Sequence, residues 1–221
     1  PGTDVIIELG GEDAKILFLT GGFEMRMNGT CAGGTGAFID QMATLLNISV
    51  GEMDELSLRA EKVYPIASRC GVFAKSDIQP LLNQGARKED ISASIFQAVV
   101  DQTVSGLAQG RRIKGKVLFL GGPLYFIKGL RKAFKDTLHL DDEHAVFPEN
   151  APSFMAVGAA LYSENVDPMP IEEAISRIEN AKGSDDVVTG DPLFKDRAEY
   201  DAFVARHKKS DLAFEDIKTY K

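Results

Sequence analysis

The residues of this chain with the most obvious chemical reactivity are two cysteines, the only ones among 221 residues. Cys31 lies in the glycine-rich segment 28–37, and Cys70 lies in the apolar segment 66–74. Two thiolates are half of the four ligands that an iron–sulfur cluster or a tetrahedral zinc ion takes. Two copies of the chain around a twofold axis would supply all four, so the sequence allows a metal centre shared by a dimer.

The cysteines also have simpler interpretations. A free cysteine is often a small buried apolar residue, and zinc sites usually draw on close CxxC pairs, which this sequence lacks. A disulfide is disfavoured in the reducing cytosol that the low cysteine content indicates. Arg69 precedes Cys70 and would favour its thiolate. The three histidines lie in polar stretches and are interpreted as surface residues: His139, His144 and His207.

A second chemical feature is the turn 8–15, where two glycines lie among acidic residues. Gly10 and Gly11 allow backbone N–H groups to point at a phosphate with no Cβ in the way. Glu8 or Asp13 at such a turn could hold a hydrated Mg²⁺ or orient an attacking water. The alternative is a tight turn with solvated acids, and the spacing alone does not decide between the two.

Two further glycine motifs precede expected helices. Gly33–Gly36 would place free N–H groups at a helix N-terminus, where the helix dipole favours phosphate. The motif lacks the Lys-Ser/Thr pair of a P-loop, and it would serve equally as a flexible turn that presents Cys31. Gly121 and Gly122 end an apolar strand, which suits either the close approach of an adenine or ribose, or a strand-to-helix turn that needs glycine.

The elements expected to position these motifs alternate between strands and helices. Apolar runs predict strands over 4–9, 14–19, 23–27, 116–120 and 145–147, of which the first two form a hairpin. Helical spacing of apolar residues predicts a helix from Gly36 onward and helices over 50–60, 76–84, 88–109, 126–136 and 153–162. Ser49 is a candidate N-cap, and the small residues of 153–162 suit close packing on a sheet. This alternation predicts an α/β domain.

Composition narrows the class of protein. The chain is 44% hydrophobic and 26% charged, which is typical of a soluble globular protein with one large domain, or one domain and a tail. The net charge of −8 argues against nonspecific binding of nucleic acid or anionic membrane. No apolar run approaches the roughly 18 residues that cross a bilayer, and no secretory signal is visible. We expect a cytoplasmic protein with no nucleic-acid or membrane partner.

The sequence changes character after about Val166. Prolines and glycines punctuate two polar helical stretches, the second over 196–209. We interpret 166–221 as a polar helical extension or linker toward a further domain, with a cap packed on the core as the alternative. The chain begins at Pro1 without an initiator methionine, which favours a piece of a longer protein over a complete chain behind a processed tag.

Taken in order, these motifs resemble the BadF/BadG/BcrA/BcrD ATPase family, and within it the activators of 2-hydroxyacyl-CoA dehydratases. The order is an acidic Gly-Gly hairpin, a Cys-Ala-Gly-Gly-Thr-Gly helix start, a Cys-Gly-Val-Phe-Ala segment, a long helix, a strand ending in Gly-Gly, and Ala-Val-Gly-Ala-Ala-Leu. The resemblance covers about Asp4 to Tyr162.

The resemblance implies the actin/Hsp70/sugar-kinase fold, a ribonuclease H-like α/β fold of two lobes with ATP in the cleft between them. It implies a homodimer in which one 4Fe–4S cluster bridges the subunits. Nucleotide (ATP or ADP with Mg²⁺) would drive a low-potential electron from a donor such as ferredoxin or flavodoxin onto the dehydratase. The family's first phosphate hairpin is missing before Pro1, so we expect 4–165 to be the second lobe, with a helical insertion, and to be inactive alone. Glu8 replaces the usual Asp, as in the large activase-related branch.

The resemblance also assigns roles to individual positions. Cys31 and Cys70 fall on the cluster cysteines, and Glu8 and Asp13 on the catalytic positions of the second phosphate motif. The remaining positions would bind nucleotide: Gly10, Gly11, Lys15, Gly33, Gly34, Thr35, Gly36, Gly121, Gly122 and Pro123.

Two other functions stay open at this point. A small-molecule kinase of the same fold, for example for an amino sugar, would need a catalytic Asp but no paired cysteines. A non-catalytic regulatory module would bind nucleotide without turnover. Iron binding at the cysteines separates the activator from both alternatives.

Overall fold

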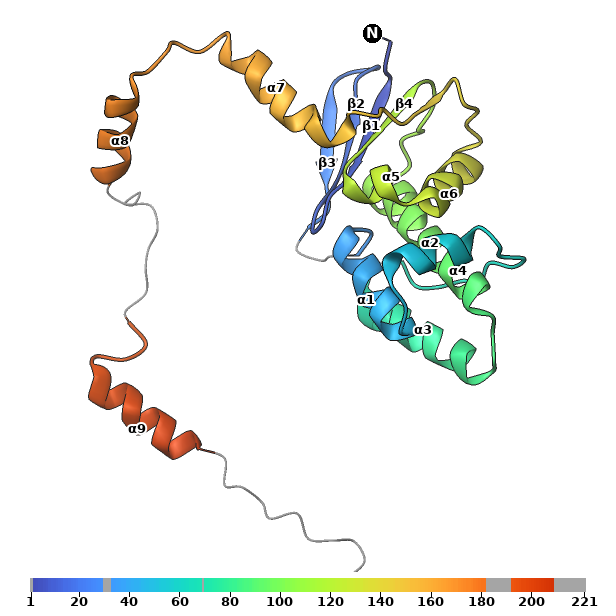
Figure 1. Cartoon of the computed structure of the whole chain (residues 1–221), viewed down its shortest axis with the longest axis horizontal. Helices are drawn as coiled ribbons and strands as arrows, with labels where there is room; N and C mark the ends of the chain where they lie inside the picture. The colour runs from blue at the N-terminus through green and yellow to red at the C-terminus, as the bar shows by residue number, and fades with distance from the viewer. Residues whose placement is uncertain (1, 30–32, 69, 182–191, 209–221) are drawn as a thin grey trace, which may run out of the picture. The chain divides into compact units, whose positions relative to one another are not determined.

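The structure is a computed structural model that describes residues 2–29, 33–68, 70–181 and 192–208. The chain falls into two units, Pro1–Val166 and Asp167–Lys221, which are described separately. The first unit combines one sheet with helices (Figure 1), which confirms the predicted α/β class.

A five-stranded mixed sheet of order β3-β2-β1-β4-β5 organises the first unit. Strands β1 (Val5–Leu9), β2 (Ala14–Phe18) and β3 (Glu24–Met27) form an antiparallel meander. Strands β4 (Val117–Leu120) and β5 (Ala145–Val146) add to the other side of β1 in parallel. Each strand lies within two residues of its predicted bounds, because short runs rich in apolar residues, several of them next to glycine, mark them clearly.

The two faces of the sheet differ in burial. Side chains alternate along β1 and β2, as they do when one face of a sheet packs on a core. On the other face Glu8, Lys15 and Leu17 are only half-buried. The buried face carries these side chains, each at most 2% exposed: Val5, Ile7, Leu9, Ala14, Ile16 and Phe18.

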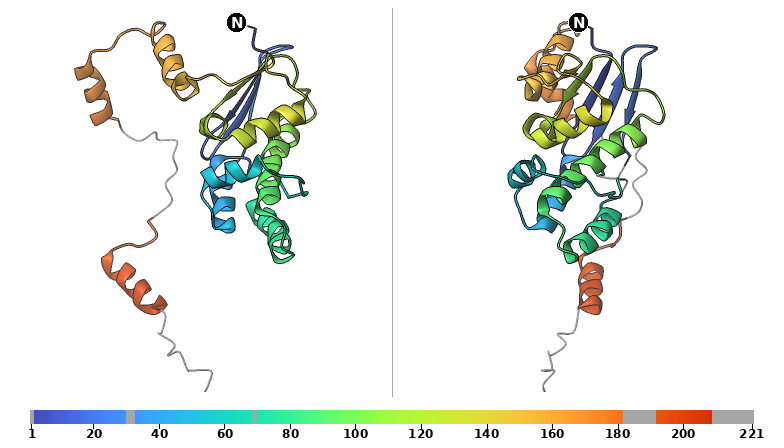
Figure 2. Two further views of the ribbon diagram at one scale, coloured as in Figure 1. Left: turned by 45° about the vertical axis from the view of Figure 1, so that its right-hand side comes forward. Right: turned by 90° about the vertical axis from the view of Figure 1, so that its right-hand side faces the viewer.

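Most helices of the first unit gather at the end of the sheet where β1 terminates and along its buried face (Figures 1 and 2). They are α1 (Gly36–Leu46), α2 (Val50–Ser57), α3 (Gly71–Asn83), α4 (Lys88–Asp101), α5 (Gly122–Phe126) and α6 (Lys128–Leu138). A short 3₁₀ turn, η2 (Ala151–Ser153), leads into α7 (Phe154–Ser163), which begins at the less covered face of the sheet. Helix α4 packs against α2 and α6. Ser49 caps α2 in a capping box with Glu52, as predicted.

Three helix predictions need correction. Helix α3 begins at Gly71 rather than 76, directly after Cys70. The helix predicted over 88–109 is α-helical only to Asp101 and continues as a π-helix, η1 (Gln102–Leu107). The helix predicted over 126–136 is α6, which begins at Lys128, and a separate short helix, α5, precedes it; the two are divided at Ile127, which is extended and buries its side chain at 5% exposure.

The predicted close packing of 153–162 on the sheet is also wrong. Helix α7 has no buried residue, and Met155 and Tyr162 are 74% and 71% exposed. Only its first residues approach the sheet, where Phe154 and Met155 line a pocket with Leu17. Small side chains alone do not bring a helix into contact with a sheet.

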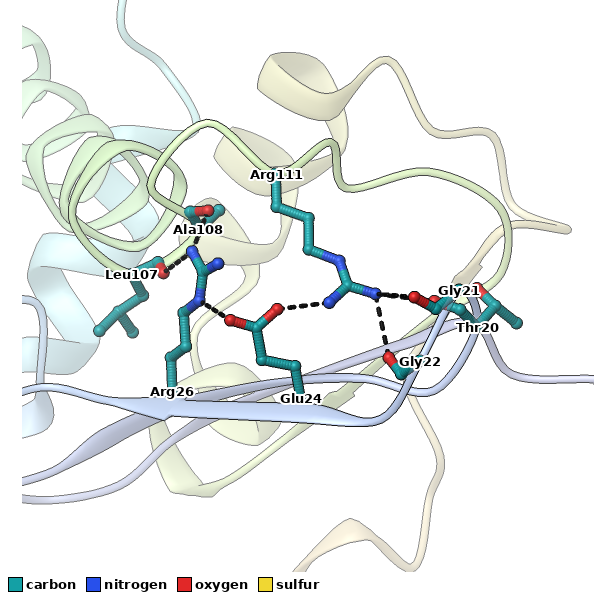
Figure 3. Close-up of polar contacts among 8 residues, drawn as sticks. All are labelled: Thr20, Gly21, Gly22, Glu24, Arg26, Leu107, Ala108 and Arg111. Carbon is teal, nitrogen blue, oxygen red and sulfur yellow. Dashed lines mark hydrogen bonds and ion pairs between the residues drawn. The ribbon is translucent and has the colours of Figure 1, made fainter.

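A polar cluster ties β3 to the end of η1 (Figure 3). Glu24 is shared by two arginines, with Arg26 Nε at 2.7 Å from one carboxylate oxygen and Arg111 paired with the other. Hydrogen bonds from Arg26 and then Arg111 hold the pKa of Glu24 below its usual range. Both guanidinium groups lie over the ring of Phe18. Their other N–H groups donate to the main-chain carbonyls of Leu107, Ala108, Thr20, Gly21 and Gly22.

The described residues of the second unit form two helices, α8 (Ile171–Glu179) and α9 (Arg197–His207), in the polar region where helices were predicted. Asp196 caps α9 by accepting the N–H of Glu199 at 2.9 Å. In the part of the chain that the structure describes, no helix is long and apolar enough to cross a bilayer. All three histidines are exposed, as expected.

Candidate functional site

Three glycine motifs that lie far apart in the sequence meet at the end of β1. The N–H of Gly36 donates to the carbonyl of Gly10 at 2.9 Å, and the N–H of Ala37 donates to that of Gly11 at 2.7 Å. A Cβ atom on Gly36 would lie 3.3 Å from the Gly10 oxygen and 3.4 Å from Pro123 Cγ. The turn after β1, the start of α1 and the start of α5 are therefore in direct contact.

These hydrogen bonds correct one expectation. The predicted anion site at Gly33–Gly36 relied on free N–H groups at the start of the helix. The N–H groups of Gly36 and Ala37 are instead engaged by carbonyls of the β1–β2 turn. That turn is itself closed by the Gly10 N–H, which donates to the carbonyl of Asp13 at 2.7 Å. The dipole of α1 still favours an anion near its N-terminus. The N–H groups of Gly36 and Ala37, however, are already hydrogen-bonded and do not bind it.

Gly121 has a strict steric reason to be glycine. Its φ is +94°, and a Cβ atom there would lie 1.9 Å from the carbonyl oxygen of Leu9. The end of β4 can therefore pass β1 only without a side chain. This close passage brings Gly122 and Pro123, in the first turn of α5, to the rim of a pocket.

The pocket has a volume of about 480 Å³ and an unequal lining. Glycine backbone from the three motifs forms one side, and apolar side chains form another. Asp40 of α1 adds a carboxylate, and the ring of Phe126 at the end of α5 is 71% exposed. A second acidic residue, Glu12 of the β1–β2 turn, also lines the pocket. An aromatic ring, carboxylates and open backbone are suited to a ligand with a planar ring and hydroxyl groups. The lining also includes Gly11, Gly36, Ala37, Ile39, Val50, Gly122, Pro123 and Ile127.

Sequence reasoning missed Asp40 and Phe126. Each is a single residue on a helix surface, where acidic and aromatic residues are common. Only the folded arrangement shows that they line the same pocket.

The predicted catalytic acids lie together but are bridged by a lysine. Lys15 Nζ is 3.2 Å from Glu8 Oε2 and 2.7 Å from Asp13 Oδ2. The hydrogen bond to Asp13, and then the contact with Glu8, raises the pKa of Lys15. Glu8 lines a second pocket, of about 450 Å³, on the less covered face of the sheet. In this structure Lys15 therefore bridges the two carboxylates and offsets one of their two negative charges.

The glycine loop before α1 is supported by the π-helix. Gly34 has a φ of +80°, and a Cβ atom there would lie 2.9 Å from Gln102 Cγ. A Cβ atom on Gly106 would lie 2.7 Å from Gln102 Nε2, so the Gln102 side chain lies between two glycines. Thr35 is fully buried beside them. The sequence gives no signal for Gln102, because a helical pattern does not reveal a π-helical turn.

Cys70 is the N-cap residue of α3, with a half-buried side chain. Backbone N–H groups of Phe73 and then Val72 lower the pKa of its thiol, as expected at a helix N-terminus. The cause that the sequence suggested, Arg69, lies outside the described residues. A Cβ atom on Gly71 would lie 3.3 Å from Gln41 Oε1 of α1. Cys70 is therefore next to the helix into which the Cys31 segment leads.

Cys31 lies outside the described residues, so the structure places only one of the two predicted metal ligands. Within the ranges that the structure describes, no group of three or more His, Cys, Asp or Glu side chains could hold a metal ion.

The mixed sheet with its helices, and the likeness to the solved structures described below, define the fold class as the actin-like α/β fold. More narrowly, residues 1–163 match the model of the BadF/BadG/BcrA/BcrD ATPase family. The chain belongs to this family, as its motifs indicated.

Several relatives are activators of dehydratases. The chain is 33% identical over 165 residues to the (R)-2-hydroxyglutaryl-CoA dehydratase activating ATPase of Acidaminococcus fermentans, covering 74% of this chain and 62% of the relative. It is 33% identical over 166 residues to the 2-hydroxyisocaproyl-CoA dehydratase activator of Clostridioides difficile, covering 74% and 60%. The chain thus spans about three fifths of the length of these relatives.

Solved structures show the same likeness. The activator of the 2-hydroxyisocaproyl-CoA dehydratase from Clostridium difficile, with bound ADPNP, matches with a TM-score of 0.65 at 31% identity. The match covers 83% of this chain and 65% of that one. Component A of the Acidaminococcus fermentans (R)-2-hydroxyglutaryl-CoA dehydratase matches with a TM-score of 0.64 at 34% identity, covering 72% of this chain and 61% of that one.

Proposed function

We propose that this chain is the nucleotide- and cluster-binding part of an activator that couples ATP hydrolysis to low-potential electron transfer. Its partner would be a 2-hydroxyacyl-CoA dehydratase or a related enzyme that acts on a CoA substrate in anaerobic metabolism. The observation that carries the proposal is the meeting of three glycine motifs around one pocket, in a chain whose relatives are dehydratase activators.

The pocket fits a nucleotide. The ring of Phe126 offers a surface for adenine, and the carboxylate of Asp40 is an acceptor for ribose hydroxyl groups. The backbone at Gly11 and Gly122 leaves room for phosphates, since a Cβ atom on either glycine would meet no atom within 4 Å. Bound ATP would supply the free energy of hydrolysis.

The remaining predicted positions would support that nucleotide. Glu8 and Asp13 are the carboxylates of the turn and would ligate hydrated Mg²⁺ directly or through water. Lys15 would hold these carboxylates or a phosphate oxygen. The loop of Gly33, Gly34 and Thr35 would fix the start of α1 behind the phosphates.

The thiol of Cys70 fits a cluster ligand. Its pKa is lowered by the N–H groups that begin α3, and metal centres bind the thiolate form. With Cys31 each chain would contribute two thiolates, so a homodimer would complete one 4Fe–4S cluster, which supplies one-electron chemistry when bound. Val72 and Phe73 beside Cys70 are 69% and 65% exposed, and they would be covered where the two subunits meet.

The electron donor would be a ferredoxin or flavodoxin, and the compartment the cytoplasm, where the thiols stay reduced.

Anaerobic reconstitution with iron and sulfide tests the proposal. We expect about two irons per chain, a visible charge-transfer absorption and the mass of a dimer, as one shared four-iron cluster requires. Cys31→Ser and Cys70→Ser should each abolish iron uptake, with the unsubstituted chain incubated without sulfide as the control. Full iron content and an unchanged spectrum in Cys31→Ser would refute the cluster. A colourless monomer with both thiols titratable would favour the kinase or the regulatory module.

A further inference from the structure

Residues 58–68, which lead from α2 toward Cys70, form no helix or strand, yet their backbone is anchored at fixed points. Asp90 Oδ1, in the first turn of α4, accepts the N–H of Glu61 at 2.8 Å and that of Lys62 at 3.1 Å. Ser94 Oγ, one turn further along α4, accepts the N–H of Tyr64 at 2.7 Å. An irregular segment can satisfy its donors only through such side chains or water.

The spacing of these acceptors fits the segment. Four residues along an α-helix rise about 6 Å, and two residues of extended chain span about 6.6 Å. Asp90 and Ser94, four residues apart, therefore meet alternate N–H groups, those of Lys62 and Tyr64. Side chains of α4 thus accept the backbone N–H groups that the carbonyls of a neighbouring strand would accept in a sheet.

Both acceptors are buried, so they depend on these partners. Asp90 is 5% exposed and Ser94 is 1% exposed. A buried carboxylate is costly unless hydrogen bonds satisfy it, and the two N–H groups of the segment do so. The Ser94 hydroxyl donates to the Asp90 carbonyl at 2.6 Å, which directs its oxygen lone pairs toward the segment.

The segment is anchored again close to Cys70. Ile66 is 8% exposed and belongs to the hydrophobic core. The N–H of Ala67 donates to Asp77 Oδ2 at 2.8 Å, and Asp77 lies in α3, the helix that Cys70 caps. The chain is therefore held against α4, the core and α3 in turn before it reaches the thiol.

We propose that Asp90 and Ser94 are positioning residues for Cys70, which hold segment 61–67 against α4 and thereby fix the thiol at the start of α3. This inference rests on the proposed function, in which Cys70 ligates the cluster. Some residues orient a metal ligand without touching the metal themselves. Removing such a residue typically changes metal affinity by about 10–100-fold.

Four variants of the full chain test the inference. Asp90→Ala and Ser94→Ala remove the acceptors, whereas Asp90→Asn keeps an Oδ1 that can accept both N–H groups. Ser92→Ala is the matched control, because Ser92 is fully buried on the same helix and its hydroxyl has no partner among the described residues.

Amide exchange and ¹⁵N relaxation give a readout that needs no metal. We expect Asp90→Ala and Ser94→Ala to speed exchange at residues 61, 62 and 64 at least about tenfold. The backbone order parameter at Cys70 should fall from about 0.85 toward 0.6 in both variants. Asp90→Asn and Ser92→Ala should match the unsubstituted chain. If Cys70 stays fully ordered while the segment exchanges freely, the inference is wrong.

Iron loading at limiting iron gives the second readout. Asp90→Ala should load about 10–100-fold more weakly, and Asp90→Asn should restore loading. Equal loading of Asp90→Ala, Ser94→Ala and the unsubstituted chain would overturn the positioning role. If the unsubstituted chain takes up no iron, the cluster proposal fails, and the order parameter alone decides the inference. If Asp90→Ala does not fold, Ser94→Ala, which removes two neutral hydrogen bonds and no charge, decides it.

Discussion

Substituting Gly121 tests the contact on which the candidate site depends. A Cβ atom at this position would lie 1.9 Å from the carbonyl oxygen of Leu9, and the φ of +94° is one that side-chain-bearing residues rarely adopt. Backbone strain of this kind costs about 1–3 kcal/mol. Overpacking against a fixed neighbour costs about another 1–3 kcal/mol. We therefore expect Gly121→Ala to lower the free energy of unfolding by about 2–6 kcal/mol, a large part of the 5–15 kcal/mol typical of a domain.

The neighbouring glycine provides the control. A Cβ atom on Gly122 would meet no atom within 4 Å, so Gly122→Ala should change stability by no more than about 0.5 kcal/mol. Urea unfolding followed by far-ultraviolet circular dichroism measures both variants. A lower midpoint at an unchanged slope indicates lost stability, not a changed unfolded state. If Gly121→Ala and Gly122→Ala unfold at the same urea concentration, β4 does not pass β1 as closely as described, and the pocket geometry is wrong.

Three further predictions concern single side chains. Phe126→Ala should weaken ADP binding about tenfold, because adenine would lose an aromatic surface worth about 1–3 kcal/mol; calorimetry checks this, and equal affinity would exclude adenine from that wall. Phe73→Ser should shift the cluster-loaded protein toward monomer in analytical ultracentrifugation, and an unchanged dimer would place the interface elsewhere; Phe23→Ser, at a residue 73% exposed in the β2–β3 turn, is the control. Hydrogen bonds from the N–H groups of Glu61 and then Lys62 lower the pKa of Asp90, so the stability it contributes is full above its unfolded pKa of about 3.9 and is lost as pH falls below that value. Urea unfolding between pH 7 and pH 3 should therefore show a smaller acid loss in Asp90→Asn, and parallel curves would contradict this.

Much of the fold follows from local pattern. The strands are short runs rich in apolar residues, and glycines directly follow β1 and β4. The order of glycine and cysteine motifs was specific enough to indicate the family. Motif order is preserved along the chain, so it needs no knowledge of how the segments pack.

The elements that were mispredicted depend on tertiary contacts. The first turn of α3 includes Val72 and Phe73, which are exposed, and its N-cap is Cys70 rather than a typical Ser, Thr, Asp or Asn. The break between α5 and α6 occurs at Ile127, where no Gly or Pro marks it, because the core takes up that side chain. Neither feature has a local signal.

The candidate site was predicted in part for the same reason. The glycines of the three motifs were identified from the sequence, and the structure brings them together. The hydrogen bonds that join Gly36 to Gly10 link residues from separate motifs, so no local pattern shows that these donors are already used. Lys15 is predicted as a cofactor ligand, yet its bridge between Glu8 and Asp13 depends on the hairpin pairing that places Lys15 opposite Glu8.

The start of α1 provides a short physical connection between the two halves of the proposed function. Asp40 lines the candidate nucleotide pocket, and the next residue, Gln41, approaches Gly71 beside Cys70. A helix moves as a rigid unit over so short a distance, and its packed contacts permit discrete rearrangements more readily than gradual sliding. A shift of the first turn of α1 on nucleotide binding would therefore be transmitted to the N-terminus of α3. Asp90 and Ser94 hold the segment before Cys70 against α4. A shift of α1 would therefore move the start of α3 relative to this segment, and with it the position of the Cys70 thiol.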